Sequence, residues 1–263
     1  MIEELKYFLL GLIQGLAEFF PVSSSGHVVL FSTILDLTRE NPLLLSIIVH
    51  TATTLSTVII YRNRIFSIIK GVIRNNKEDV AFFVKILLSS IPIIIAGLLF
   101  RDSIELIFNN STHLIAIMLI LTGLVLLIQL KGKREKDSIS YYDALLMGVA
   151  QAVAIIPGIS RSGATISMAL LCKIKREKAA EFSFLMVLMP ILGISILELI
   201  ILFSSPLELT ELEFRGLLIA FFSSLISGLF ACKYMIIMVQ NNNLKYFGYY
   251  CILIGVIFYF FLL

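Results

Sequence analysis

Long apolar segments separated by short polar loops run along the whole chain. A helix needs about 20 predominantly apolar residues to cross a bilayer. Six segments come close to that length, at 43–61, 80–100, 113–130, 180–203, 215–239 and 246–263. The pattern therefore predicts six transmembrane helices, each next to a polar or charged loop.

Two further apolar regions, 7–35 and 141–172, are interrupted near their middle. A stretch with proline, serine and glycine at 21–26 breaks the first region, and a similar stretch at 157–163 breaks the second. Each half holds about 14–16 residues, or about 21–24 Å of helix at 1.5 Å per residue. Because this length is too short to cross a bilayer, we expect two re-entrant hairpins built from broken helices.

Lysine and arginine are unevenly distributed among the loops. Alternating loops form two sets, of which one holds 14 of these residues and the other 4. The richer set is 62–79, 131–142, 173–178 and 240–245, and the poorer set is 1–6, 36–42, 101–112 and 204–215. The positive-inside rule places the richer set in the cytoplasm. This topology closes only if hairpin 7–35 enters from outside and hairpin 141–172 enters from inside.

The two hairpins are also similar in sequence. A shift of 137 residues aligns 11–26 with 148–163, and six of the sixteen positions are identical. The identical pairs are Gly11/Gly148, Gln14/Gln151, Ala17/Ala154, Ser23/Ser160, Ser25/Ser162 and Gly26/Gly163. Similarity combined with opposite orientation is typical of an inverted-topology repeat, whose broken helices meet near the midplane and form the binding site. We therefore expect one all-α polytopic membrane domain over 1–263, with repeats at 1–135 and 136–263.

Composition supports a membrane protein and excludes several other classes. Hydrophobic residues make up 59% of the chain and charged residues 15%, against about 25% charge in soluble proteins. A water-soluble enzyme and a disulfide-rich secreted fold are excluded, since the three cysteines lie in apolar stretches. Because the basic residues sort by membrane side, as topology requires, nothing indicates a nucleic-acid partner.

Six charged residues fall inside the predicted apolar segments, where each costs about 3 kcal/mol on insertion scales. Lys85 and Lys233 lie close enough to the cytoplasmic end of their spans to snorkel, and Glu198 lies similarly near the outer end. Glu181 begins its span, so a helix-start role and a site role remain equally open. The other two, Glu18 and Arg161, sit beside the two breaks. They form either a structural ion pair or a shared polar site.

The neighbours of Glu18 favour a site. Gln14 and Glu18 are four residues apart, so their oxygens share one helix face and suit Mg²⁺ or Ca²⁺. The serines that follow Pro21 precede a new helical stretch, whose free N–H groups attract an anion. Gly26 permits close approach of the backbone, and His27 titrates near neutral pH. The candidate anion ligands on this hairpin are Ser23, Ser24, Ser25 and Gly26.

The second hairpin offers complementary groups. Arg161 can form two parallel hydrogen bonds to phosphate oxygens, and Ser160, Ser162 and Thr165 add hydroxyls. Another intramembrane histidine, His50, is evenly balanced between a packing role and a site role. Taken together, these residues predict a phosphate-handling centre in the membrane, with a prenyl or acyl phosphate as substrate.

At these residues the chain resembles the undecaprenyl-diphosphate phosphatase family, also called the bacitracin-resistance protein family. The matching motifs are Gln14-Gly-Leu-Ala-Glu18-Phe-Phe-Pro-Val-Ser-Ser-Ser-Gly-His27, Pro157-Gly-Ile-Ser-Arg-Ser-Gly-Ala-Thr165 and Glu181-Phe-Ser-Phe184. The resemblance implies a hydrolase of the bacterial plasma membrane that converts undecaprenyl diphosphate to undecaprenyl phosphate and inorganic phosphate. Such an enzyme recycles the lipid carrier for peptidoglycan synthesis, confers bacitracin resistance and requires a divalent cation.

Several questions remain open from sequence alone. We expect Arg161 and a cation held by Glu18 and Gln14 to neutralise the diphosphate. The nucleophile is Ser24 activated by His27, His27 itself or a water, and we favour the first. The main rival function is a transporter or flippase of prenyl phosphate lipids with the same fold. A homodimer also stays open, because small residues permit close helix packing at Ser223, Ser224, Ser227 and Gly228.

Overall fold

The computed structural model describes residues 2–34, 42–100, 112–128, 135–203 and 210–261, and its regular secondary structure there is helical. The helices are α1 (Ile2–Phe19), α2 (Ser24–Ile34), α3 (Pro42–Ile73), α4 (Lys77–Leu99), α6 (Thr112–Leu127), α7 (Tyr141–Val153), α8 (Arg161–Leu171), α9 (Arg176–Met186), α10 (Leu188–Phe203), α11 (Glu211–Gln240) and α12 (Leu244–Phe261). The expected all-α class is therefore confirmed.

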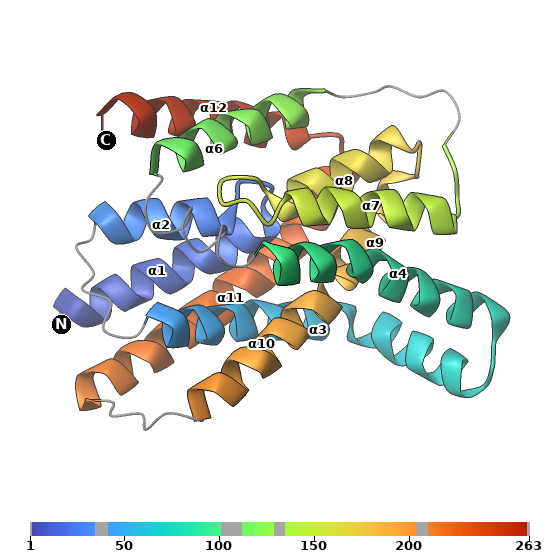
Figure 1. Ribbon diagram of the computed structural model, residues 1–263, viewed down its shortest axis with the longest axis horizontal. Helices are drawn as coiled ribbons and strands as arrows, with labels where there is room; N and C mark the ends of the chain where they lie inside the picture. The colour runs from blue at the N-terminus through green and yellow to red at the C-terminus, as the bar shows by residue number, and fades with distance from the viewer. Residues whose placement is uncertain (1, 35–41, 101–111, 129–134, 204–209, 262–263) are drawn as a thin grey trace.

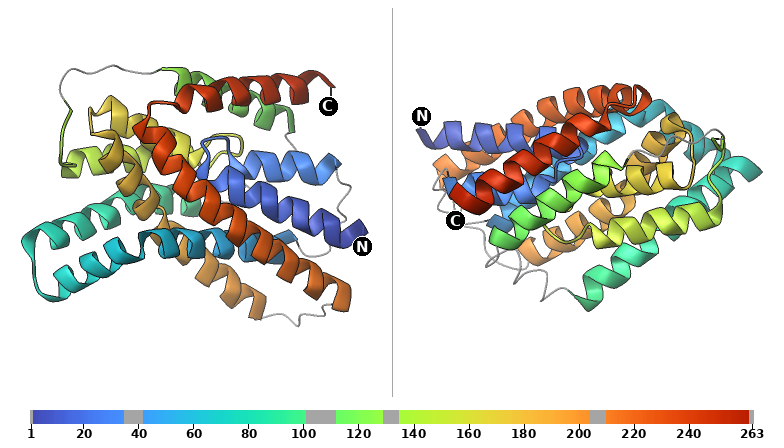
Figure 2. Two further views of the ribbon diagram at one scale, coloured as in Figure 1. Left: turned by 180° about the vertical axis from the view of Figure 1, so that it is seen from behind. Right: turned by 90° about the horizontal axis from the view of Figure 1, so that it is seen from above.

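Two helical hairpins approach the centre of the molecule from opposite ends. In Figure 1, α1 and α2 lie on one side and α7 and α8 on the other, and their connecting loops lie side by side in the middle. The view from behind in Figure 2 shows the same arrangement. The predicted breaks are present, since α1 ends at Phe19 and α7 ends at Val153.

Each hairpin packs its first helix on a long helix from the other half of the chain. Helix α1 lies along α11, and α7 lies along α4. Glycine at aligned positions makes both contacts close: a Cβ on Gly11 would fall on Ser223 and the backbone of Ala220, and a Cβ on Gly148 would fall on the backbone of Ser89. Small residues at such crossings let backbones approach within van der Waals contact.

The last helices of the two halves pack on each other. Helices α6 and α12 run side by side along one edge of the molecule (Figure 1). Gly123 and Gly248 face each other at this crossing, since a Cβ on either residue would meet the carbonyl oxygen of the other. The α6–α12 pair lies against both hairpins, so each break contacts one helix of the pair.

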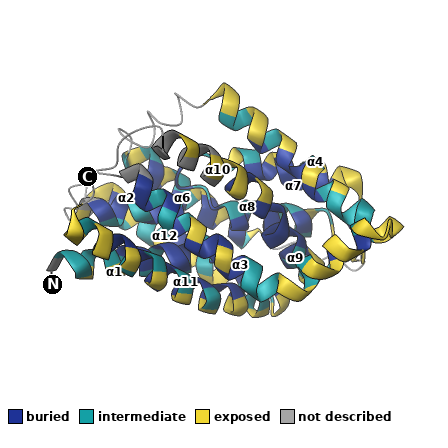
Figure 3. Ribbon diagram, turned by 90° about the horizontal axis from the view of Figure 1, so that it is seen from below, coloured by how far each residue is buried: buried dark blue, intermediate teal, exposed yellow. Residues whose placement is uncertain are grey.

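Three of the described helices are long and apolar enough to cross a bilayer, namely those containing Leu44–Ile73, Lys77–Leu99 and Glu211–Gln240. Helices α6 and α12 are apolar but shorter by the same measure. Figure 3 shows exposed residues along the outer faces of α3, α4 and α10 and buried residues where the helices meet. Many of the exposed side chains are large and apolar, among them Leu98, Phe230 and Leu253, as a bilayer requires.

Some predicted bounds were wrong. The segment 180–203 is not one helix, because the chain leaves α9 at Met186 and begins α10 at Leu188. Helix α3 continues to Ile73, well past the predicted end at 61, and in the added part Arg64 pairs with Asp79 and Glu181. Helix α1 has 18 residues, or about 27 Å of helix, which is longer than the half-hairpin expected from sequence.

Three of the remaining interior charges have ordinary explanations in the structure. Glu181 accepts a 2.6 Å hydrogen bond from Arg64 and lies 3.3 Å from Lys178, so it belongs to an ion-pair cluster. Lys85 places its ammonium 5.1 Å from the centre of the Tyr141 ring, and Lys233 is exposed. The side chain of Glu198 lies outside the described residues.

The small residues of α11 are used within the chain. Ser223, Ser224, Ser227 and Gly228 are buried against Gly11, Gly15 or α3. The hydroxyl of Ser224 donates to the Val49 carbonyl oxygen at 3.2 Å. They are therefore not the contact of a homodimer, for which the sequence had left them open.

Replacing Gly148 with alanine should destabilise the fold, because the added methyl group overlaps backbone atoms that cannot rotate away. We expect a loss of about 1–3 kcal/mol, visible as a lower midpoint of thermal unfolding in detergent. Gly193→Ala in α10 is the matched control, since nothing lies within 4 Å of a Cβ there. The control should leave stability unchanged or raise it by up to about 1 kcal/mol. Equal midpoints for the two variants would contradict the close α4–α7 crossing.

Candidate functional site

The first break is a short turn that ends in a residue with left-handed backbone. Ser23 has φ +67°, and α2 begins at the next residue. The Ser23 hydroxyl oxygen accepts a 3.3 Å hydrogen bond from the Gly26 N–H. Ser23 therefore caps the first turn of α2, which satisfies one of its free N–H groups.

The second break is capped by a serine in the same way, at aligned positions. Ser160 precedes α8, and its hydroxyl accepts a 3.1 Å hydrogen bond from the Gly163 N–H. Gly158 adopts φ +94°, which only glycine reaches without strain. Thr122 of α6 binds this loop twice, because its hydroxyl donates to the Gly158 carbonyl at 2.9 Å and accepts from the Ser160 N–H at 3.1 Å.

The two breaks bind each other directly. The Gly158 N–H donates to the Ser23 hydroxyl at 3.2 Å, and the Ser162 hydroxyl lies 3.4 Å from the Phe20 carbonyl oxygen. Gly26 faces Gly158 so closely that a Cβ on Gly26 would lie 3.2 Å from the Gly158 Cα. The sequence-based expectation that the two hairpin tips converge is thus confirmed.

Glu18 lies at the centre of the converging groups. Its Oε1 accepts a 2.9 Å hydrogen bond from Arg161, and its Oε2 accepts from the Ser24 hydroxyl at 2.7 Å and from the Gln14 amide at 3.0 Å. The Glu18 side chain is 8% exposed and that of Arg161 is 24% exposed. A buried carboxylate needs such a set of donors, since an unpaired charge there is strongly unfavourable.

His27 is placed differently from the arrangement expected from sequence. Its Nδ1 lies 2.9 Å from the Ser23 carbonyl oxygen, and its Nε2 lies 2.9 Å from the Tyr250 hydroxyl. Both nitrogens are thus engaged away from Ser24, whose hydroxyl donates to Glu18 instead. The expectation that His27 activates Ser24 does not fit this geometry. Ser24 and His27 are one helical turn apart, but the imidazole ring bonds to the Ser23 carbonyl oxygen and not to the Ser24 hydroxyl.

His50 on α3 belongs to the site. Its Nε2 lies 3.8 Å from Glu18 Oε2, while its Nδ1 lies 2.9 Å from the Ser46 carbonyl oxygen. Of the two roles the sequence left open for this residue, the geometry favours the site role.

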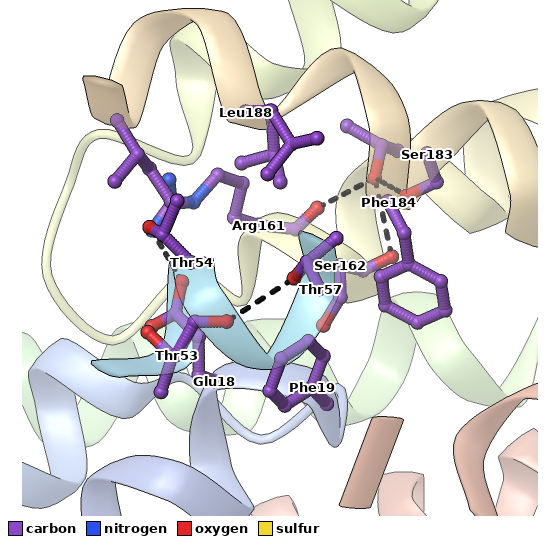
Figure 4. A pocket seen from close by; sticks show the side chains of 13 residues that line it. Glu18, Phe19, Thr53, Thr54, Thr57, Arg161, Ser162, Ser183, Phe184 and Leu188 are labelled. Carbon is purple, nitrogen blue, oxygen red and sulfur yellow. Dashed lines mark hydrogen bonds and ion pairs between the residues drawn. The ribbon is translucent and has the colours of Figure 1, made fainter. Parts of the chain in front are cut away.

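A pocket opens beside the Glu18–Arg161 pair. Figure 4 shows that Thr53, Thr54 and Thr57 of α3 line it together with Ser162 of α8 and Ser183 of α9. Its apolar wall comes from α1 and from the region where α9 gives way to α10, with Phe19, Phe184, Val187, Leu188 and Ile191. The pocket therefore joins a polar floor to an apolar wall.

The predicted phosphate ligands divide into two groups. Ser162 and Thr165 line the pocket with Arg161. The others do not line the pocket and form hydrogen bonds within their own break: Ser23, Ser25, Gly26 and Ser160. The Ser23 and Ser25 hydroxyls lie 3.4 Å apart, and the Ser160 and Ser162 hydroxyls lie 3.3 Å apart.

Sequence reasoning missed several polar residues of the pocket. Ser183 meets the Thr165 hydroxyl at 2.6 Å, and it lies inside the motif that includes Glu181 and Phe184. Thr53, Thr54 and Thr57 recur on α3 at helical spacing after His50, which is the signal that could have revealed them. Their hydroxyls donate to carbonyl oxygens of their own helix, so such threonines are easily taken for packing residues.

The residues present fit a divalent cation that completes its shell with other ligands. Gln14 Oε1 is buried and lacks a hydrogen-bond partner in the described part of the chain, next to the Glu18 carboxylate. No group of three or more His, Cys, Asp or Glu suited to a metal occurs among the described residues. Mg²⁺ is commonly bound by one or two protein oxygens together with substrate phosphates and water, which is the set available here.

Comparison with known proteins identifies the family. The model of the bacitracin resistance protein BacA matches residues 7–257. A protein from Bacteroides fragilis named undecaprenyl-diphosphatase is 39% identical over 257 residues, covering 97% of both chains. Proteins of the same name from Christiangramia forsetii and Methanococcus maripaludis are 40% and 41% identical, over 94% and 95% of this chain and 94% and 96% of their own. The chain therefore belongs to the bacitracin resistance protein family.

Proposed function

We propose that this protein hydrolyses undecaprenyl diphosphate to undecaprenyl phosphate and inorganic phosphate. Its family and the names of its relatives support this activity. The observation that carries the proposal is the buried ion pair of Glu18 and Arg161, joined to the Ser24 hydroxyl where the two breaks meet. The activity recycles the lipid carrier for peptidoglycan synthesis and confers bacitracin resistance.

The pocket suits an amphiphilic diphosphate. Arg161 uses one N–H to bind Glu18, which leaves further donors of its guanidinium for phosphate oxygens. The Ser162 and Thr165 hydroxyls lie in the same pocket. The apolar wall at Val187, Leu188 and Ile191 is the natural place for the first isoprene units. Catalysis of phosphoryl transfer rests chiefly on positioning and neutralising charge, and these residues supply both.

In the mechanism we propose, Ser24 is the nucleophile and Glu18 takes its proton. The Ser24 oxygen attacks the terminal phosphorus while its proton passes to Glu18 Oε2, 2.7 Å away. The bond from that phosphorus to the bridging oxygen breaks, and undecaprenyl phosphate leaves. Water then attacks the phosphoserine, the bond from phosphorus to the Ser24 oxygen breaks, and inorganic phosphate leaves. The proton held by Glu18 returns to the Ser24 oxygen, which restores the hydroxyl and the carboxylate. His27 contributes to this site through its hydrogen bond to the Ser23 carbonyl oxygen, which fixes the peptide that precedes Ser24.

A divalent cation, Mg²⁺ or Ca²⁺, is the cofactor we propose. Gln14 Oε1 and Glu18 would hold it beside the pocket. Bound there, the ion would neutralise phosphate charge during transfer.

We also propose that the chain is an inverted-topology repeat in the bacterial inner membrane, with its basic loops in the cytoplasm. The repeats are 1–135 and 136–263, with six membrane-crossing segments and two re-entrant hairpins. Matching contacts support this: Ser23 and Ser160 cap in the same way, and Gly11 and Gly148 pack in the same way.

Such folds also occur in transporters, so movement of prenyl phosphate lipids is the alternative function. A phosphate-release assay of the purified protein with undecaprenyl diphosphate distinguishes hydrolysis from transport, because a pure transporter releases no phosphate.

Arg161→Lys should lower kcat/KM for undecaprenyl diphosphate by about 100- to 1,000-fold in the phosphate-release assay. Lysine keeps the charge but loses the planar fork that binds Glu18 and phosphate together. Arg62→Ala is the control, because Arg62 is exposed on α3 and bonds to the Ile59 carbonyl of its own helix. Activity of Arg161→Lys near that of the control would contradict the assignment of Arg161.

Ser24→Ala should abolish both turnover and any phosphoenzyme trapped by acid quench with substrate labelled in its terminal phosphate. Glu18→Gln should greatly slow formation of the phosphoenzyme, since the amide cannot take the proton. Peptide mapping of the trapped protein should place the phosphate on Ser24. Label on His27 would refute this assignment, and inversion at phosphorus in one step would refute every covalent version.

A further inference from the structure

The hydroxyl group of Tyr250 on α12 binds the ring of His27. The hydroxyl oxygen lies 2.9 Å from His27 Nε2. The two rings are also stacked, with centroids 5.6 Å apart and planes within 13°. Tyr250 does not line the pocket, and its hydroxyl reaches the site through His27.

The partners of His27 define which ring nitrogen carries the proton. A carbonyl oxygen can only accept, so the Nδ1 that lies 2.9 Å from the Ser23 carbonyl carries a hydrogen. In the neutral ring Nε2 is then an acceptor, and the Tyr250 hydroxyl donates to it. Phe31 stacks near His27, with centroids 6.2 Å apart, and His27 is only 2% exposed. An apolar surrounding of this kind favours the neutral ring.

The position of the His27 ring matters because it fixes one peptide group. The Ser23 carbonyl accepts from His27 Nδ1 and also from the His27 backbone N–H, at 2.9 and 3.1 Å. Ser23 adopts the uncommon φ of +67°, and such a conformation persists only when surrounding contacts hold it. The next residue is Ser24, whose hydroxyl points to Glu18. A ring free to turn would thus loosen the peptide that carries Ser24.

We propose that Tyr250 is a positioning residue, which locks the tautomer and orientation of His27 and thereby the backbone of Ser23 that presents Ser24. The inference rests on the proposed hydrolysis, which gives Ser24 its role. Through this chain of contacts, a helix near the C-terminus controls the geometry of a turn near the N-terminus.

Tyr250→Phe isolates the contact, because it removes the hydroxyl and keeps the stacked ring. Tyr249→Phe is the matched control on the same helix, where Tyr249 is 59% exposed. In the phosphate-release assay, Tyr250→Phe should lower kcat about tenfold and leave KM within about twofold, since substrate contacts are unchanged. The control should retain the kcat of the unchanged protein, and both variants should unfold at similar temperatures.

Nitrogen-15 NMR of histidine-labelled protein provides a readout that does not depend on activity. The chain has three histidines, and the His27 signals are those lost in His27→Gln. Removing the Tyr250 hydroxyl should move the Nε2 signal toward that of an imine nitrogen without a hydrogen bond. The inference is overturned if this signal stays in place in Tyr250→Phe, or if kcat equals that of Tyr249→Phe. Absence of phosphate release by the unchanged protein would instead refute the proposed hydrolysis, while the Nε2 signal would still report on the contact.

Discussion

A helix that stops inside an apolar protein leaves backbone N–H and C=O groups without partners, and this constraint shapes the whole structure. In lipid, each such group must be satisfied from within the protein. Here, some partners come from the same hairpin, as in the caps of Ser23 and Ser160, and others come from the opposite hairpin or from α6 and α12. The Gly158 N–H binds Ser23, the Gly158 carbonyl binds Thr122, and the Cys251 thiol lies 3.6 Å from the Pro21 carbonyl. The breaks are therefore mutually dependent.

The same constraint governs the charges. Glu18 and Arg161 come from different hairpins, and each would be costly to bury alone. Their pairing at 2.9 Å holds only while the hairpins meet as they do. A pair of this kind contributes little net stability compared with apolar packing, so its presence beside a pocket indicates chemistry more than folding. The same bond orients the guanidinium of Arg161 at the edge of the pocket.

The sequence predicted what depends on local pattern and failed where geometry depends on distant contacts. Proline with serine and glycine marked both breaks, and the scarcity of charge singled out Glu18 and Arg161. The orientation of His27 was not predictable, because it depends on Tyr250, more than 220 residues away in the chain. The end of α9 at Met186, by contrast, had a local signal that the prediction overlooked: Pro190 cannot donate a hydrogen bond to the Met186 carbonyl four residues earlier, and its ring clashes with it.

The pocket exists partly because of that unpredicted helix end. Val187 lies between α9 and α10, and it lines the pocket together with Leu188 and Ile191. Had α9 continued straight into α10, these side chains would follow one helix axis instead of flanking Arg161. Meanwhile α9 supplies Ser183 to the polar floor through its bond to Thr165. The interruption between α9 and α10 thus places a hydroxyl and an apolar wall in one pocket, the two surfaces that the proposed amphiphilic substrate needs.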